Sequence, residues 1–161
     1  PELGMNSPEH VLITPGGVIV LTTKDVSGRI SVDGRRWRQH RLLFLRFFNL
    51  GAPSLGNPTI ENELQMDRLE AVFDELALPG DIEGVIVFMP DEVEIQMKDP
   101  ESTVVHVSEL FDMVREIGSE VQLGNEDRNQ LVEALTVGRR FETTGARPAR
   151  PKKKLKVSGP G

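Results

Sequence analysis

The chain has 161 residues, of which 38% are hydrophobic and 27% charged, a composition typical of one globular domain with a tail. It contains no cysteine, which excludes a disulfide framework, a thiolate zinc site, an iron–sulfur cluster and a cysteine nucleophile. No apolar run approaches the roughly 18 residues of a membrane span, and residues 1–16 lack the pattern of a secretory signal. We therefore expect a cytoplasmic protein with no membrane partner.

Charge is distributed unevenly along the chain. Residues 1–60 carry a net charge of +3, residues 61–146 carry −15, and residues 147–161 carry +6, against a total of −6. Because the basic side chains are concentrated in two regions, a nucleic-acid-binding face is compatible with the acidic total.

The first forty residues are predicted to form strands joined by turns. Short β-branched runs at 10–14 and 18–24 flank a Pro-Gly-Gly sequence, which predicts a hairpin. A second hairpin is predicted from residues 29–32 and 35–39, since Asp33-Gly34 between them favours a type I′ turn with positive φ at both residues. Residues 40–50 are apolar without clean alternation, and we interpret them as extended.

The next segment predicts a helix followed by three strands. Apolar residues recur every three to four positions from Ile60 to Leu76, which predicts an amphipathic helix with an acidic outer face. A continuous apolar run at 84–89 predicts a buried central strand, and shorter strands are predicted at 93–97 and 103–107.

Two more helices and a tail complete the predicted organisation. Ser108 is expected to cap a helix that reaches about residue 117, and Asn125 to cap a last helix over 126–137. From residue 145 onward Pro, Gly and Lys replace apolar residues, which predicts disorder. We divide the chain into an α/β domain at 1–142 and a basic tail at 143–161.

The most informative stretch runs from Glu9 to Lys24. It contains an acid and a histidine, a strand, Pro-Gly-Gly and a second strand that ends in Thr-Thr-Lys; a glycine turn, Trp37 and Asn57-Pro58 follow. This order and spacing resemble the nuclease-related domain (NERD) family over about residues 9–137. The family's usual N-terminal helix is missing, as expected if the chain begins in mid-domain.

This resemblance implies a fold and an activity. The fold would be the restriction-endonuclease-like core of the PD-(D/E)xK nucleases, an α/β fold with a mixed sheet flanked by helices. The activity would be metal-dependent cleavage of DNA phosphodiesters, with Mg²⁺ or Mn²⁺ as the cofactor, in a bacterial-type domain.

The resemblance also implies the site residues. Glu9 corresponds to the first metal-binding acid, and Lys24 to the lysine that orients the attacking water and offsets negative charge. Thr22 stands where the family has its second acid, and a hydroxyl is a weaker ligand than a carboxylate. Glu61, near the family's usual Gln, is a candidate for the missing metal ligand; the alternative is an acid on a solvated helix face.

Basic side chains form the candidate nucleic-acid contacts. They are Arg29, Arg36 and Arg38 in the second hairpin, Arg41 just after it, and Lys152, Lys153 and Lys154 in the tail. Strand alternation places Arg36 and Arg38 on one face, with Arg35 and Trp37 on the other. Trp37 is either an aromatic platform for bases or a packing residue.

Three functional hypotheses remain open. The first is a DNA-processing nuclease whose catalysis is impaired by Thr22. The second is a noncatalytic DNA- or protein-binding module on the same fold, which acts through residues 29–46 and the tail. The third is a regulatory domain whose acidic helix faces, at 61–83 and 91–101, engage a basic protein partner.

Overall fold

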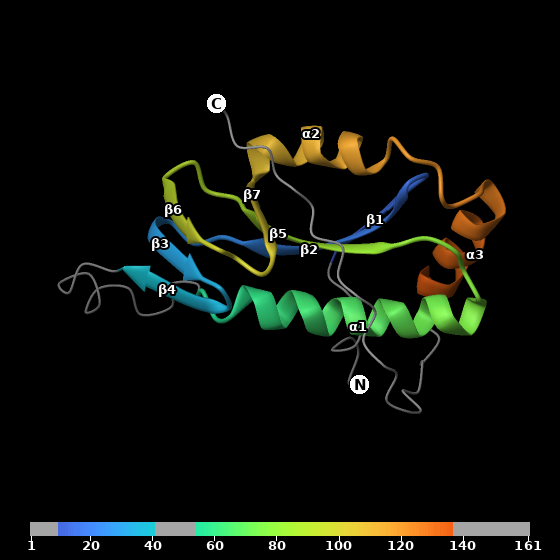
Figure 1. Cartoon of the computed structure of the whole chain (residues 1–161), viewed down its shortest axis with the longest axis horizontal. Coiled ribbons are helices and arrows are strands. Elements are labelled where there is room, and N and C mark those ends of the chain that lie inside the picture. Colours follow the sequence, from blue (N-terminus) through green and yellow to red (C-terminus); the bar gives the residue numbers. More distant parts are fainter. Residues whose placement is uncertain (1–9, 41–53, 137–161) are drawn as a thin grey trace.

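The structure is a computed structural model, and it describes residues 10–40 and 54–136. These residues form two mixed β-sheets and three helices, which confirms the predicted α/β class (Figure 1). One sheet has the order β1-β2-β5-β7, from β1 (His10–Thr14), β2 (Gly17–Lys24), β5 (Ile82–Phe88) and β7 (Thr103–His106). The other has the order β4-β3-β6, from β3 (Gly28–Asp33), β4 (Arg36–His40) and β6 (Val93–Lys98). The helices are α1 (Pro58–Leu76), α2 (Val107–Ile117) and α3 (Asn125–Thr136).

This architecture is consistent with a restriction-endonuclease-like fold, with the strands divided between two sheets rather than placed in one. The sheets are continuous through two chain segments that run side by side. Strand β2 is parallel to β5 and ends with Lys24 opposite Phe88, and β3 is parallel to β6 and begins with Gly28 opposite Val93. Between the sheets, residues 25–27 lie opposite residues 89–92, and the Met89 N–H donates to the Lys24 carbonyl while the Gly28 N–H donates to the Glu92 carbonyl.

The four-stranded sheet is buried on both faces. Val18 and Val20 of β2 pack with Leu69 of α1 in one core, whereas Ile19 and Leu21 pack against α2 in another. Figure 1 shows the corresponding layers, with α2 above the sheet and α1 below it. Because both faces of β2 are covered, its sequence is almost continuously apolar, as expected for a central strand with parallel pairing.

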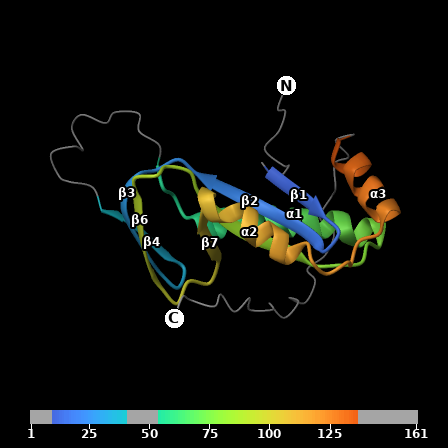
Figure 2. The same cartoon turned by 90° about the horizontal axis from the view of Figure 1, so that it is seen from above.

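The three-stranded sheet is buried on one face only. Its inner face carries Ile30 and Trp37, which pack with Ile86 and Phe88 of β5 and with Leu55. The alternate residues of its strands are largely exposed. Figure 2 shows this sheet and α3 at opposite ends of the molecule.

The prediction for the second hairpin turn is wrong in one respect. Asp33 is the last residue of β3 and has negative φ, so the two-residue loop is Gly34-Arg35. Only Gly34, at φ +58°, adopts a left-handed conformation there. A type I′ turn is excluded because it needs positive φ at both central residues.

The predicted helix caps and one predicted helix face are also wrong. His106 caps α2: its Nδ1 accepts a hydrogen bond from the Ser108 N–H, and its own N–H donates to Glu109 in a capping box. Asn125 is the first residue of α3 rather than its cap. The acidic stretch 91–101 contains β6 and turns, not a helix.

Several predictions concern parts of the chain outside the described residues. They are the extended segment after residue 40, the domain boundary at 142 and the basic tail. Within the described part of the chain, no helix has the length and apolar character needed to cross a membrane.

Close packing of α1 on β5 yields a stability prediction at Gly84. A Cβ at this position would collide with the side chains of Asn62 and Met66. We expect Gly84→Ala to lower the free energy of unfolding by about 1–3 kcal/mol, because the helix must move away from the sheet. Urea denaturation measures this loss. The exposed Glu70→Ala, on the same helix, should change stability by about 0.5 kcal/mol or less, and an equal loss in both variants would contradict the close approach.

Candidate functional site

Lys24 and Glu61 are brought together where β2 ends and α1 begins. Lys24 Nζ lies 2.6 Å from Glu61 Oε2, and the side chains are 11% and 41% exposed, respectively. The Asn-Pro motif positions Glu61, since Asn57 Oδ1 caps the helix by accepting from the Ile60 N–H and Pro58 occupies the first helical position. The structure therefore joins two of the predicted site residues in one ion pair.

Gly56 permits this approach of the helix to the lysine. Its φ is +63°, and a Cβ there would lie 2.5 Å from Glu61 Oε1. A residue with a side chain would both strain the backbone and displace the carboxylate.

Thr22, which the resemblance aligns with the family's second acid, is held in a neutral buried pair. Its side chain is 2% exposed, and Thr22 Oγ1 accepts a hydrogen bond of 3.0 Å from Asn62 Nδ2. The same amide donates to the Val20 carbonyl oxygen at 3.1 Å. Thr22 and Lys24 face α1 together because strand side chains alternate between faces.

Asn62 was not among the predicted site residues. Its signal was present, since Asn62 precedes Met66 by four residues and Leu69 by seven, which places it on the inner side of a helical pattern. A polar residue at such a position needs buried partners. Here the partners are the oxygens of β2.

The described residues do not complete a site for a divalent cation. Glu61 is the carboxylate at this position and already pairs with Lys24, while the Thr22 hydroxyl is neutral and bonded to Asn62. No group of three or more His, Asp or Glu with metal-binding geometry occurs in the described part of the chain. Since Mg²⁺ prefers about six oxygen ligands, these residues do not fit the ion that the family implies. The other predicted ligand, Glu9, lies outside the described residues.

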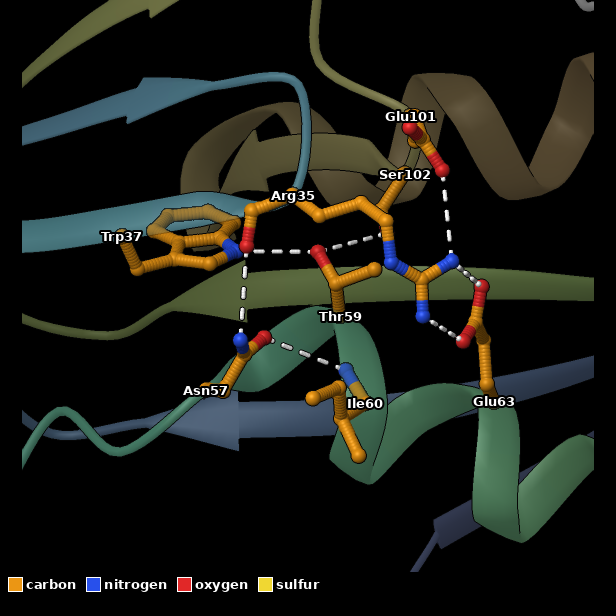
Figure 3. Close-up of polar contacts among 8 residues, drawn as sticks. All are labelled: Arg35, Trp37, Asn57, Thr59, Ile60, Glu63, Glu101 and Ser102. Atoms are coloured by element: carbon orange, nitrogen blue, oxygen red, sulfur yellow. Dashed lines mark hydrogen bonds and ion pairs between the residues drawn. The ribbon is translucent and has the colours of Figure 1, made fainter.

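Arg35 ties the small sheet to α1 and to the segment before β7. Its guanidinium forms two hydrogen bonds with Glu63, at 2.5 and 2.9 Å, and one with Glu101 at 3.2 Å (Figure 3). The hydrogen bonds to Glu63 and then to Glu101 raise the pKa of Arg35 above its usual value. Arg35 is therefore engaged within the protein and is not a free cation for DNA.

Trp37 is a packing residue rather than a platform for bases. Its Nε1 donates to Thr59 Oγ1 at 2.9 Å, and its ring lies 5.9 Å from that of Phe88 between centroids. Ser102 donates to the same Thr59 oxygen (Figure 3). These contacts fix the small sheet to the first turn of α1.

The other predicted basic residues lie on the opposite face of the small sheet. Arg36 and Arg38 are exposed on β4, and Arg29 on β3 is 3.4 Å from Glu94. Within the described residues, neither Arg36 nor Arg38 forms an ion pair, in contrast to Arg35. Arg41 and the three tail lysines are outside the described ranges.

A profile of the nuclease-related domain matches residues 4–89, more than half of the chain. The chain therefore belongs to the nuclease-related domain family, whose known context is the PD-(D/E)xK superfamily. No match was found among curated proteins or among solved structures.

The Asn62 contacts yield a prediction that depends on pH. We expect Asn62→Leu to lower stability by about 1–3 kcal/mol, because buried oxygen acceptors lose their donor. Asn62→Asp should be more destabilising at pH 8 than at pH 5, since a buried carboxylate facing oxygens has a raised pKa and can donate only when protonated. Urea unfolding at both pH values measures this difference, relative to the parent. A loss for Asn62→Asp that is the same at both pH values would contradict the assigned contacts.

Proposed function

We propose that this chain is a DNA-processing member of the nuclease-related domain family in which phosphodiester hydrolysis is strongly reduced. The observation that carries the proposal is the Thr22–Asn62 hydrogen bond at the position of the family's second acid. A neutral, buried pair there supplies neither the charge nor the free oxygens that a hard cation requires.

The ion pair of Lys24 supports the same conclusion. A lysine that assists hydrolysis must direct its ammonium group toward water and phosphate. Here that group is bound to Glu61 at 2.6 Å and is largely shielded from solvent. We expect any residual hydrolysis to depend on Lys24.

The second candidate function is a noncatalytic DNA-binding module on the same fold. The observation that favours it is the exposure of Arg36 and Arg38 without ion pairs in the described part of the chain. Exposed guanidinium groups bind phosphate oxygens whether or not hydrolysis follows. Plasmid nicking by variants of Thr22 distinguishes the two functions.

Restoring an acid at position 22 should increase plasmid nicking in Mg²⁺ or Mn²⁺. Thr22→Asp is close to threonine in size, and its carboxylate can accept the same hydrogen bond from Asn62. Thr22→Asn is the matched control, since it has the same shape without the charge. We expect the parent and Thr22→Asn to nick plasmid at background rates, and Thr22→Asp to exceed both.

Adding Lys24→Met to Thr22→Asp tests the assigned lysine. The gained nicking should disappear, because the charge beside the phosphate is lost. Substantial metal-dependent nicking by the parent would contradict the proposed loss of hydrolysis. A folded Thr22→Asp protein that remains inactive would favour the noncatalytic module over a degenerate nuclease.

A further inference from the structure

The outer face of the three-stranded sheet is built from three cross-strand rows. The pairing register gives Arg36–Asp33–Lys98, Arg38–Ser31–Gln96 and His40–Arg29–Glu94. The first two rows line a shallow hollow of about 310 Å³. Val32 and Met97 complete its lining, so the hollow is partly apolar.

The charge of this outer face differs from that of the surrounding chain. Its three rows contain four basic side chains and two acidic ones, which are Arg29, Arg36, Arg38 and Lys98 against Asp33 and Glu94. By contrast, residues 54–136 without Glu94 and Lys98 contain 19 acidic side chains and three basic ones. A polyanion would be repelled by most of that segment, so favourable contact is concentrated on the outer face.

The hollow offers several donors to an anion. Arg36 and Arg38 are exposed on β4, at one edge of the sheet. Lys98 projects from β6 at the other edge, with its side chain 74% exposed and its Nζ 3.3 Å from Asp33 Oδ2. Ser31, on the central strand β3, and its partner Gln96, on β6, belong to the neighbouring row. Guanidinium, ammonium, hydroxyl and amide groups are the donors that commonly contact DNA phosphates.

We propose that this outer face binds the phosphodiester backbone of DNA, with Arg36, Arg38 and Lys98 as its principal cations. The inference rests on the proposed DNA function and deepens it, because it adds Lys98 to the DNA contacts and places them away from the Lys24–Glu61 pair. This difference in place follows from the alternation of side chains along β4. Trp37 points inward to Thr59 at the start of α1, so its neighbours Arg36 and Arg38 point away from that helix.

The same geometry favours duplex DNA over single strands. Proteins that hold single strands usually stack the bases on aromatic rings. Trp37, the aromatic residue of the hairpin, is packed on Phe88 on the inner face, and the outer rows described above contain no Phe or Trp. Contacts to a duplex backbone need no such platform.

The test is fluorescence anisotropy with a labelled DNA duplex, in EDTA so that nothing is cleaved, at several salt concentrations. Arg38→Gln and Lys98→Gln should each weaken binding and reduce the slope of log affinity against log salt by about 1. Arg68→Gln, which removes the same charge from an exposed position on α1, is the matched control and should leave the slope unchanged. A single strand of the same sequence should bind no more tightly than the duplex.

The outcomes distinguish this inference from the function on which it rests. Equal effects of Arg38→Gln, Lys98→Gln and Arg68→Gln would overturn the outer face as the docking surface, while duplex binding by the parent would still support a DNA function. Absence of duplex binding by the parent at low salt would overturn both. Tighter binding of the single strand would overturn the assignment of the outer face to duplex backbone. Because all three substituted side chains are exposed, urea unfolding should confirm that each variant is folded.

Discussion

The buried amide of Asn62 is the contact on which the arrangement of the candidate site depends. It reaches from α1 to the Thr22 hydroxyl and the Val20 carbonyl of β2, and it draws the helix so close to the sheet that Gly84 has no room for a side chain. With the helix fixed in this way, its capped first turn places Glu61 beside Lys24. Nearby, the first turn and the helix surface hold the small sheet through Trp37 and Arg35.

This contact also shows how the centre of the proposed degenerate site is held without an acid at position 22. A carboxylate buried near Thr22 would be costly unless a cation or several donors balanced its charge. Threonine and asparagine form a hydrogen bond without any ion, and the charge of Lys24 is balanced by Glu61. These two pairs therefore need no bound ion. The DNA-binding face that we propose is the outer face of the small sheet, which is turned away from α1.

Much of this fold could be predicted from sequence because its signals are local. The strands of both hairpins, the helix after Asn57-Pro58 and the buried strand around Val85 all follow from alternation, turn residues and apolar runs. The caps were harder to predict, since His106 replaces the usual hydroxyl or carboxyl cap of α2. The separation into two sheets could not be predicted, because the segments that pair as β2–β5 and β3–β6 lie more than sixty positions apart in the sequence.

The candidate site was predictable in part. Lys24 and Thr22 were found from the order of motifs, and Glu61 from its place after Asn-Pro. The contacts that these side chains form could not be predicted, because they are long-range. Lys24 and Glu61 are 37 positions apart in the sequence, and Thr22 and Asn62 are 40 apart. Neither Asn62 nor Lys98 belongs to a recognisable motif. The packing of α1 shows what Asn62 contacts, and the register of β6 shows which residues lie beside Lys98.

Mn²⁺ binding is the most direct test of the proposal that a neutral pair has replaced a metal ligand. Electron paramagnetic resonance would measure the affinity of the parent, Thr22→Asp and Thr22→Asn for Mn²⁺ in the absence of DNA. We expect Thr22→Asp to bind Mn²⁺ more tightly than the other two, which should be indistinguishable. Binding by the parent as tight as that of Thr22→Asp would contradict the proposal.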